Sequence, residues 1–245
     1  ILWSWHIWLT SYPGEHVYAN NAGVMMDRNL GSLSMEKGNP KGFGLLYQWG
    51  RKDPFLGSSS ISSNTIAKST ITTWPSAVSS DSSNGTIAYA TANPTTFIKY
   101  NESNEDWYYT GSSSTDNTRW TTSESSKSIY DPCPAGWRVP DGGSNGVWSK
   151  ALGSSSDFYY PYNSTNEGMN FSGKFGSAST IWYPASGCRS GSDGMLYNLG
   201  NCGYFWSASP SDNYAYGLSF SGGGFVFLSD DDHRADGQSV RCLQE

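Results

Sequence analysis

The residue types with the most obvious chemistry occur together near the C-terminus, in the stretch FVFLSDDDHR. Its consecutive aspartates Asp230, Asp231 and Asp232 offer the carboxylate oxygens that Ca²⁺ prefers. A calcium site needs ligands that converge on one point, whereas adjacent residues of an extended chain point to alternate sides. We therefore predict solvated aspartates presented for contact, with a structural Ca²⁺ as the alternative and no other cofactor.

His233 lies beside Asp232 and close to Asp236, a combination that could supply part of a catalytic triad. A triad also needs a nucleophile held in a rigid, supported geometry. Serines occur throughout the chain, and none of them lies in a GxSxG-type elbow. We therefore expect no enzymatic activity. A carbohydrate-processing enzyme is an alternative, which would need two convergent carboxylates in a deep pocket.

The cysteines and histidines do not have the spacing of a zinc site. None of the four cysteines forms a CxxC pair, and the three histidines are scattered along the sequence. In an extracellular protein an even number of cysteines is typical of disulfides. Spacing alone leaves three connectivities open; we favour Cys133–Cys242, which would close a long loop, together with Cys188–Cys202.

The composition of the 245-residue chain indicates a secreted protein rich in strands and loops. Hydrophobic residues make up 36% and charged residues 15%, whereas 15% are aromatic, so Ser, Thr, Asn and Gly must dominate the polar surface. These residues favour turns and strands over helices. The net charge of −6 without a basic stripe argues against nucleic acid. No apolar run is long enough for direct membrane insertion.

The chain opens with ILWSWHIWLTS, whose alternating residues predict a paired strand, and we expect an export signal upstream of it. We expect Trp3, Trp5 and Trp8 to pack in the core or on a sheet. Residues 57–127 form a Ser/Thr-rich insertion, which we predict to be ordered because aromatic side chains interrupt it. A short helix at GVWSKALG and many short strands between glycine-rich turns complete an α+β fold, mostly β and loops.

Four stretches outside the insertion resemble one family of bacterial domains: VMMDRNLGS, YDPCPAGWRVP, GYFWSASP with AYGLSF, and GQSVRC. In order and spacing they are similar to the C-type lectin-like domain of the Fibrobacter succinogenes major paralogous domain and its Bacteroides surface-protein relatives. They resemble more closely the variable proteins of diversity-generating retroelements. The resemblance implies a single C-type lectin-like domain over residues 1–245. It supports Cys133–Cys242 and does not extend to Cys188–Cys202.

The resemblance also implies a variable region over residues 204–242. Variable regions of retroelements arise by replacement of adenines, mostly in AAC- or AAT-type asparagine codons, which cannot yield Lys, Glu, Gln, Met or Trp. Residues 207–237 contain none of these five types, although all of them recur upstream. The residues that we predict to vary and to bind ligand are Ser211, Asp212, Asn213, Tyr214, Gly217, Ser219, Ser221, Phe225, Phe227, Ser229, Asp230, Asp231, Asp232, His233 and Asp236.

These observations predict an extracellular, adhesin-type protein on a bacterial cell surface, at a pilus tip or on a lipoprotein anchor. The expected partner is a protein or glycan on another cell or host surface, with other pilus subunits as a further possibility. We expect the predicted site residues to share one exposed face, with Leu218, Phe220 and Val240 beneath it. The alternatives are a structural pilus subunit without diversified binding, a carbohydrate-binding domain, and a phage receptor-binding protein.

Overall fold

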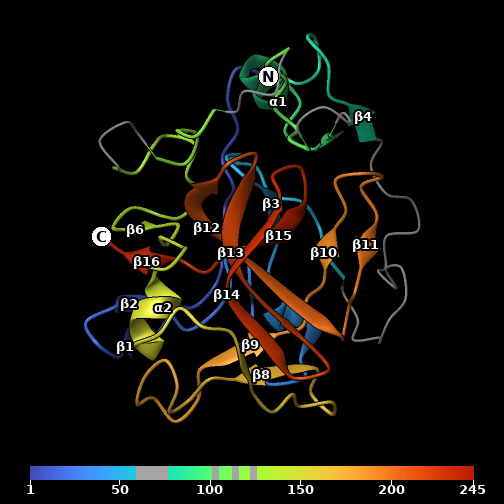
Figure 1. Ribbon diagram of the computed structural model, residues 1–245. Coiled ribbons are helices and arrows are strands. Elements are labelled where there is room, and N and C mark those ends of the chain that lie inside the picture. Colours follow the sequence, from blue (N-terminus) through green and yellow to red (C-terminus); the bar gives the residue numbers. More distant parts are fainter. Residues whose placement is uncertain (59–76, 101–104, 112–115, 122–125) are drawn as a thin grey trace.

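The computed structural model describes residues 1–58, 77–100, 105–111, 116–121 and 126–245, which are built mostly of short strands (Figure 1). These described residues contain two short α-helices, so the expectation of a mostly-β chain is confirmed. The elements in chain order are β1 (Glu15–Tyr18), β2 (Gly23–Met26), a 3-10 turn (Pro40–Gly42), β3 (Leu46–Gln48), β4 (Ala77–Ser79), α1 (Ile87–Ala92), β5 (Phe97–Lys99), β6 (Trp137–Arg138), α2 (Val147–Leu152), β7 (Phe158–Tyr159), β8 (Gly168–Asn170), β9 (Trp182–Pro184), β10 (Cys188–Arg189), β11 (Leu196–Tyr197), β12 (Cys202–Ser211), β13 (Tyr214–Ser221), β14 (Phe225–His233), β15 (Gly237–Ser239) and β16 (Leu243–Gln244).

The largest sheet is formed chiefly by the C-terminal part of the chain. Its strand order is β11-β10-β15-β12-β13-β14-β7, and β3 also pairs with β15. The three long strands β12, β13 and β14 form two antiparallel hairpins at its centre. Asp212 turns the first hairpin with a left-handed φ of 45°, and Gly224 helps to turn the second with a φ of 89°. Both residue types adopt this conformation readily, so the turns follow from local sequence.

A smaller sheet in the order β1-β2-β16-β6 joins the two ends of the chain. The amide of Met26 donates to the carbonyl of Cys242, and the amide of Leu30 donates to the carbonyl of Val240. The stretches VMMDRNLGS and SVRC therefore lie side by side. The disulfide Cys133–Cys242 also forms, as the sequence predicts.

The predicted disulfide Cys188–Cys202 is wrong, since both residues are free thiols. Gly187 and Gly203 form a parallel bridge, so Cys188 follows that bridge on one strand whereas Cys202 precedes it on the other. The two cysteines are thus offset by two residues along neighbouring strands. Such an offset separates their Cα atoms by roughly 8 Å, beyond the ~7 Å that a disulfide can span without backbone movement.

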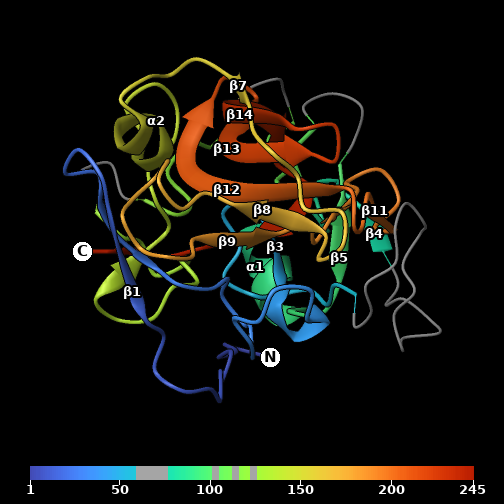
Figure 2. The same ribbon diagram turned by 90° about the horizontal axis from the view of Figure 1, so that it is seen from below.

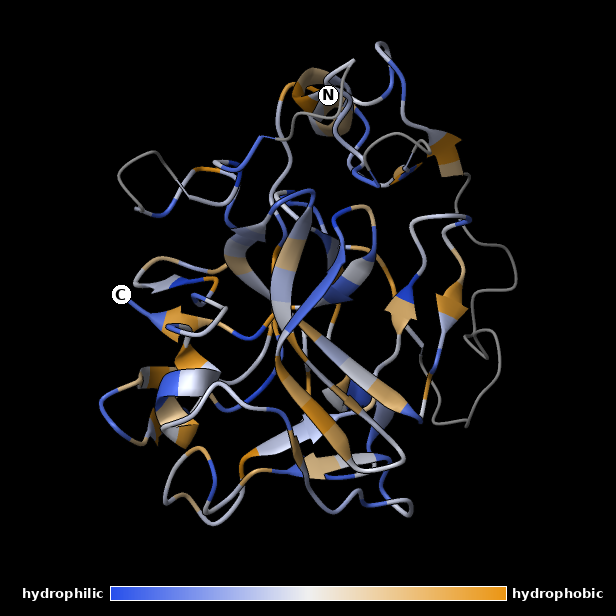
Figure 3. Cartoon of the chain, viewed as in Figure 1, coloured by the Kyte–Doolittle hydropathy of each residue, from blue (hydrophilic) through white to orange (hydrophobic). Residues whose placement is uncertain are grey.

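Two apolar cores lie on opposite faces of the central hairpins. On one face Phe205, Leu218, Phe220, Val226 and Leu228 pack with α2 and the strands β8 and β9. On the other face Trp206 and Ala215 pack with Trp49, Trp120 and Val240. Figure 3 shows β14 changing from hydrophobic at its Phe225 end to hydrophilic at its aspartates. Each core therefore covers only part of the hairpins.

Aromatic side chains hold the described parts of the insertion, as the sequence predicts for Trp107 and Trp120. Both indoles are fully buried, and their N–H groups donate to the carbonyls of Trp49 and Arg51.

Helix α2 forms at the predicted site, whereas α1 within the insertion was not expected. Its N-cap is Thr86, whose hydroxyl accepts a hydrogen bond from the Tyr89 amide. Trp74 lies outside the described residues.

The N-terminal stretch ILWSWHIWLTS differs from its prediction. It belongs to no strand, and no backbone–backbone hydrogen bond joins residues 1–13 to another described residue. Trp3 and Trp8 are half-buried, but Trp5 is exposed, so the expectation that all three pack inward is wrong for Trp5. In the described part of the chain no helix is both long enough and apolar enough to span a membrane.

Candidate functional site

The predicted site residues lie on the hairpins β12–β14, but on two surfaces rather than one. Residues paired directly across antiparallel strands point to the same face. Ser219 pairs with Phe227 and Gly217 with Asp230, whereas Tyr214 pairs with His233 and Tyr216 with Asp231. We call the first group, with Phe225, Ser221 and Asp232, the aromatic–acidic surface. The second group, with Ser211, Asp212 and Asn213, is the hairpin-tip surface.

A β-bulge in β14 produces this division. The register shifts between Gly217 and Ser219, so that Leu218 faces both Leu228 and Ser229. Phe225 and Phe227 before the bulge therefore share a face with Asp230 and Asp232 after it. The expectation of a single exposed face is wrong, because sequence alternation alone does not reveal the extra residue. Leu218 and Phe220 do lie beneath the hairpins in one core, whereas Val240 belongs to the other.

Exposed rings form one end of the aromatic–acidic surface. Tyr159 of β7 is 67% exposed and Phe225 is 43% exposed, with their ring centroids 4.0 Å apart. The ring of Phe227 lies 6.2 Å from that of Phe225 and nearly parallel to it, at 15°. Beside these rings lies a surface hollow of about 430 Å³ lined by residues 159–162 and 222–224. The rings offer rigid apolar contact area with few torsions to order on binding.

Half-buried carboxylates form the other end of this surface. The hydroxyl of Ser219 donates to Asp230, and the side-chain amide of Gln238 donates to Asp232 at 2.7 Å. Asp236, in the turn before β15, accepts from the Gly191 amide at 2.5 Å. These carboxylates are thus fixed acceptors rather than freely solvated groups. Across the residues that the structure describes, no group of three or more His, Cys, Asp and Glu side chains could hold a metal ion.

Burial and mutual repulsion raise the pKa of each carboxyl in this group. Burial is the main cause for Asp230, although its bond from Ser219 acts in the opposite direction on the pKa. Burial, with the charge of Asp230, raises the pKa of Asp232 to about 6. Burial also raises the pKa of Asp236 to about 7, against the Gly191 amide, which lowers it. Carboxyls with such pKa values retain protons into the mildly acidic range.

The raised pKa values predict that stability falls as the pH rises from about 4 to about 7. In this window the unfolded chain has released the protons of Asp232 and Asp236 while the folded chain still binds them, so the free energy of unfolding decreases. The double variant Asp232→Asn/Asp236→Asn should lose most of this decrease, roughly 5 kcal/mol for the two groups together between pH 4.5 and pH 8. Urea unfolding at pH 4.5 and pH 8 measures the difference between variant and wild type.

The pH dependence of the free energy of unfolding must be compared between the variant and the wild type, because His6 and His16 make the folded chain more stable as the pH rises. Burial lowers the pKa of each imidazole, so their contribution is lost as the pH falls. A matched control is Asp81→Asn, since the amides of Asn84 and Ser83 lower the pKa of the Asp81 carboxyl. That variant should keep the wild-type decrease. A double variant with the same decrease as the wild type would contradict the prediction.

The hairpin-tip surface combines the β12–β13 turn with residues from the insertion. The ring of His233 lies 5.5 Å from that of Tyr214 and 5.4 Å from that of Tyr100. Its Nε2 atom is 3.5 Å from a carboxylate oxygen of Glu105. A hydrogen bond to Glu105 also raises the pKa of the Tyr214 hydroxyl. The His233 side chain is thus oriented by neighbours, and Asp232 and Asp236 do not contact it as a triad would require.

Arg234 fixes the backbone beneath the hairpin tip. Its guanidinium is fully buried and donates to the carbonyls of Asp212 and Tyr214 at 2.8 Å each. It also donates to the Asp116 carbonyl at 3.1 Å and to the Asn117 side chain at 2.6 Å. Its planar group lies over the Trp49 ring, 4.5 Å from the centroid. One buried side chain therefore ties the tip to the insertion and to the core.

Gly217 cannot vary as the sequence suggests. A Cβ atom at this position would lie 2.7 Å from the Phe205 carbonyl oxygen, closer than real side chains approach backbone. Gly217→Ser should lower the free energy of unfolding by about 1–3 kcal/mol, as overpacking does. Gly223→Ser is the control, because its Cβ would have no neighbour closer than 3.6 Å. Equal thermal stability of the two variants would show that the sheet adjusts.

Several residues of both surfaces were missed from the sequence. Tyr159 joins the site because β7 pairs with β14, and its only signal was the aromatic run FYYPYN. Tyr100 and Glu105 reach the hairpin tip from the insertion, and no local pattern marks them. Ser229 is a predicted site residue whose hydroxyl is instead buried at the bulge, without a hydrogen-bond partner among the described residues.

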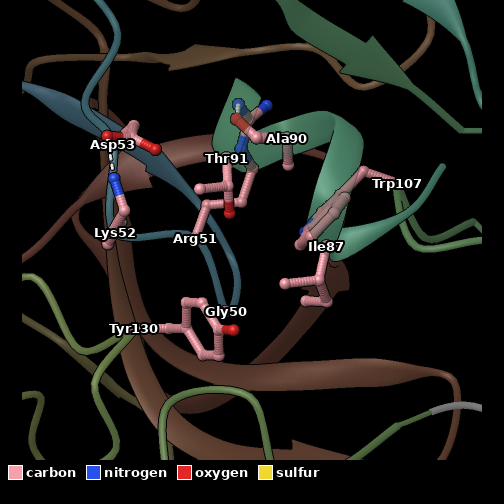
Figure 4. Close-up of a pocket in the computed structure, with 9 residues that line it drawn as sticks. All are labelled: Gly50, Arg51, Lys52, Asp53, Ile87, Ala90, Thr91, Trp107 and Tyr130. Carbon is pink, nitrogen blue, oxygen red and sulfur yellow. Dashed lines mark hydrogen bonds and ion pairs between the residues drawn. The ribbon is translucent and has the colours of Figure 1, made fainter. Parts of the chain in front are cut away.

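A small cavity lies away from both surfaces, between α1 and residues 50–53 (Figure 4). It encloses about 10 Å³ and is lined by Arg51, Trp107 and Tyr130 among others. Arg51 is buried there with its Nε atom lacking a partner among the described residues. A volume of this size holds about one water molecule. The cavity therefore suits a buried water that hydrogen-bonds Arg51, rather than a substrate.

Comparisons with protein-family models, with curated proteins and with solved structures find no match to this chain. The geometry of the two surfaces, together with the sequence, is therefore the basis of the function proposed below.

Proposed function

We propose that the chain is a ligand-binding, adhesin-type domain whose C-terminal hairpins present diversified side chains to a partner. The observation that carries the proposal is that exposed side chains and a fixed, buried framework lie next to each other within β12–β14. Phe225, Asp231 and Asp212 are exposed, while Leu218 and Arg234 are buried. Such a scaffold tolerates new side chains at the surface because the backbone beneath is held by other residues.

The resemblance to C-type lectin-like variable proteins of retroelements supports the same proposal. Randomised asparagine codons yield both bulky rings and carboxylates. Diversification would therefore explain why the two kinds of side chain adjoin one another on the aromatic–acidic surface. The rings supply apolar contact and the carboxylates supply hydrogen-bond acceptors, whereas the predicted site residue Ser219 is buried and donates to Asp230. This chemistry suits a protein or glycan ligand on another cell or a host surface. An extracellular location at the bacterial surface, consistent with the disulfide, belongs to the proposal.

Binding to a glycan array and to a panel of bacterial and epithelial cells tests the function. The variant Phe225→Ser/Phe227→Ser removes two rings of the aromatic–acidic surface with residue types that the diversification chemistry also permits. We expect it to weaken any saturable binding at least about 30-fold, the effect of losing a central aromatic contact. The variant Leu33→Ser/Met35→Ser, which truncates exposed apolar residues elsewhere, is the control. Equal loss in both variants, or no saturable binding by the wild type, would contradict the proposal.

A further inference from the structure

The N-terminal segment presents a row of large apolar side chains to solvent. Trp5, Ile7 and Leu9 are 79%, 77% and 83% exposed. The residues between them face the protein: the imidazole of His6 lies 3.4 Å from the Tyr47 hydroxyl, and the Trp8 indole donates to the Ser32 carbonyl at 2.9 Å. The segment is therefore extended, held by one row of side chains, and apolar on the other.

This row belongs to a larger apolar surface. Of the exposed large hydrophobic residues that the structure describes, more than half lie at the N-terminus or beside it: Ile1, Leu2, Trp5, Ile7, Leu9, Tyr12 and Ile129. Together they offer on the order of 1,000 Å² of side-chain area, against about 800 Å² that each partner buries in a stable interface. Isolated exposed apolar residues are normal, but so much exposed apolar area on one short segment and beside it indicates an interaction surface.

We propose that this surface is a two-fold interface between two copies of the chain, in which the row Trp5, Ile7 and Leu9 packs against the same row of a second copy. Three observations favour a second copy. The available area suffices for a stable dimer. Residues 1–14 contain no charged side chain, so the row can pair with the same row of a second copy without bringing like charges of this segment together.

The third observation is that the surface is complementary to itself. A hollow of about 420 Å³ adjoins the protruding row and is lined by Trp3, Ile129 and Pro134 together with the charged side chains of Lys52 and Asp131. A second hollow of about 530 Å³ lies further along the segment, beside Trp8 and Trp137. Under two-fold symmetry each copy supplies both protruding side chains and hollows, so the protruding row of one copy can enter a hollow of the other.

The position of the interface has a consequence for binding. Figure 2 shows the N-terminal segment on one side of the molecule and β13, β14 and β7 on the opposite side. A dimer formed through the N-terminal row therefore leaves both aromatic–acidic surfaces uncovered and directed outward. Two linked binding surfaces raise the avidity for a repetitive target without new contacts. The dimer itself does not depend on what those surfaces bind.

Sedimentation velocity over a micromolar concentration series tests the proposal. We expect the wild type to sediment as a dimer and Ile7→Asp as a monomer, with a rise of at least about 30-fold in the dissociation constant. Tyr159→Asp, which adds the same charge at an exposed apolar position of β7 on the opposite side of the molecule, should remain a dimer. Because Ile7 is exposed, its variant should keep the wild-type circular dichroism spectrum.

Three results would overturn the proposal. A monomeric wild type throughout the series would show that the row does not pair with itself. A dimer that Ile7→Asp leaves intact would place the interface elsewhere on the chain. Open-ended association would indicate a head-to-tail contact instead of a closed two-fold one.

Discussion

Arg234→Met is expected to lower the free energy of unfolding by about 3–5 kcal/mol, because it removes the charged centre of a buried hydrogen-bonded network. The carbonyls of Asp212, Tyr214 and Asp116 would lose their donor, and methionine fills the space over Trp49 without replacing it. Burial lowers the pKa of Arg234 to about 10, which still leaves the guanidinium charged at neutral pH. Urea unfolding measures the loss.

The hairpin tip should respond more strongly than the rest of the sheet. Hydrogen exchange of the amides at residues 211–214 should accelerate in Arg234→Met even under conditions where the chain stays folded. Arg138→Met is the control, since Arg138 pairs with Asp141 in a half-exposed ion pair whose loss should cost below about 1 kcal/mol. If both variants lose the same stability and the tip exchanges as in the wild type, Arg234 does not hold the binding surface.

Removing the disulfide is expected to lower the free energy of unfolding by a similar amount. Cys133 and Cys242 are separated by 109 residues, and a loop of that length corresponds to about 4–5 kcal/mol in the chain-entropy account. The double variant Cys133→Ala/Cys242→Ala should show this loss in urea unfolding under non-reducing conditions. The wild type in the presence of a reductant should show the same loss.

The free thiols provide the control for this prediction. Cys202→Ala removes a buried thiol but no bridge. The difference in free energy of unfolding between this variant and the wild type should therefore be the same with reductant as without it. A bridge between Cys188 and Cys202 would instead make Cys202→Ala more costly without reductant. Equal stability of the double variant and the oxidised wild type would show that the bridge contributes nothing.

Local signals in the sequence predict much of this fold. The helix α2 begins after Gly146 and ends at Gly153, whose left-handed φ of 74° suits glycine. The hairpins β12–β14 follow from short apolar runs between Asp-Asn and Gly-Gly-Gly turns. The strand predicted for residues 1–11 failed because periodicity shows which side chains could face a core, not whether a neighbouring strand is present.

The sequence proposes a segment for the candidate site but does not reveal its surfaces. The restricted residue alphabet of residues 207–237 marks the proposed segment, yet the bulge opposite Leu218 decides which side chains share a face. Tyr159 and Glu105 reach the site only through tertiary pairing. The structure also removes Gly217 from the set, because the space around it is occupied by backbone. These features depend on contacts between segments far apart in the sequence, which spacing does not encode.

The most direct test of the central claim, that these hairpins display diversified side chains, is the DNA sequence around the gene. We expect a near-copy of the coding segment for residues 204–242 beside a reverse transcriptase gene, differing from it only where the copy carries adenine. The differing codons should include those of exposed residues such as Asp212, Phe225 and Asp231, and exclude those of Gly217 and Arg234. The absence of such a copy, or differences spread without regard to adenine, would contradict the claim.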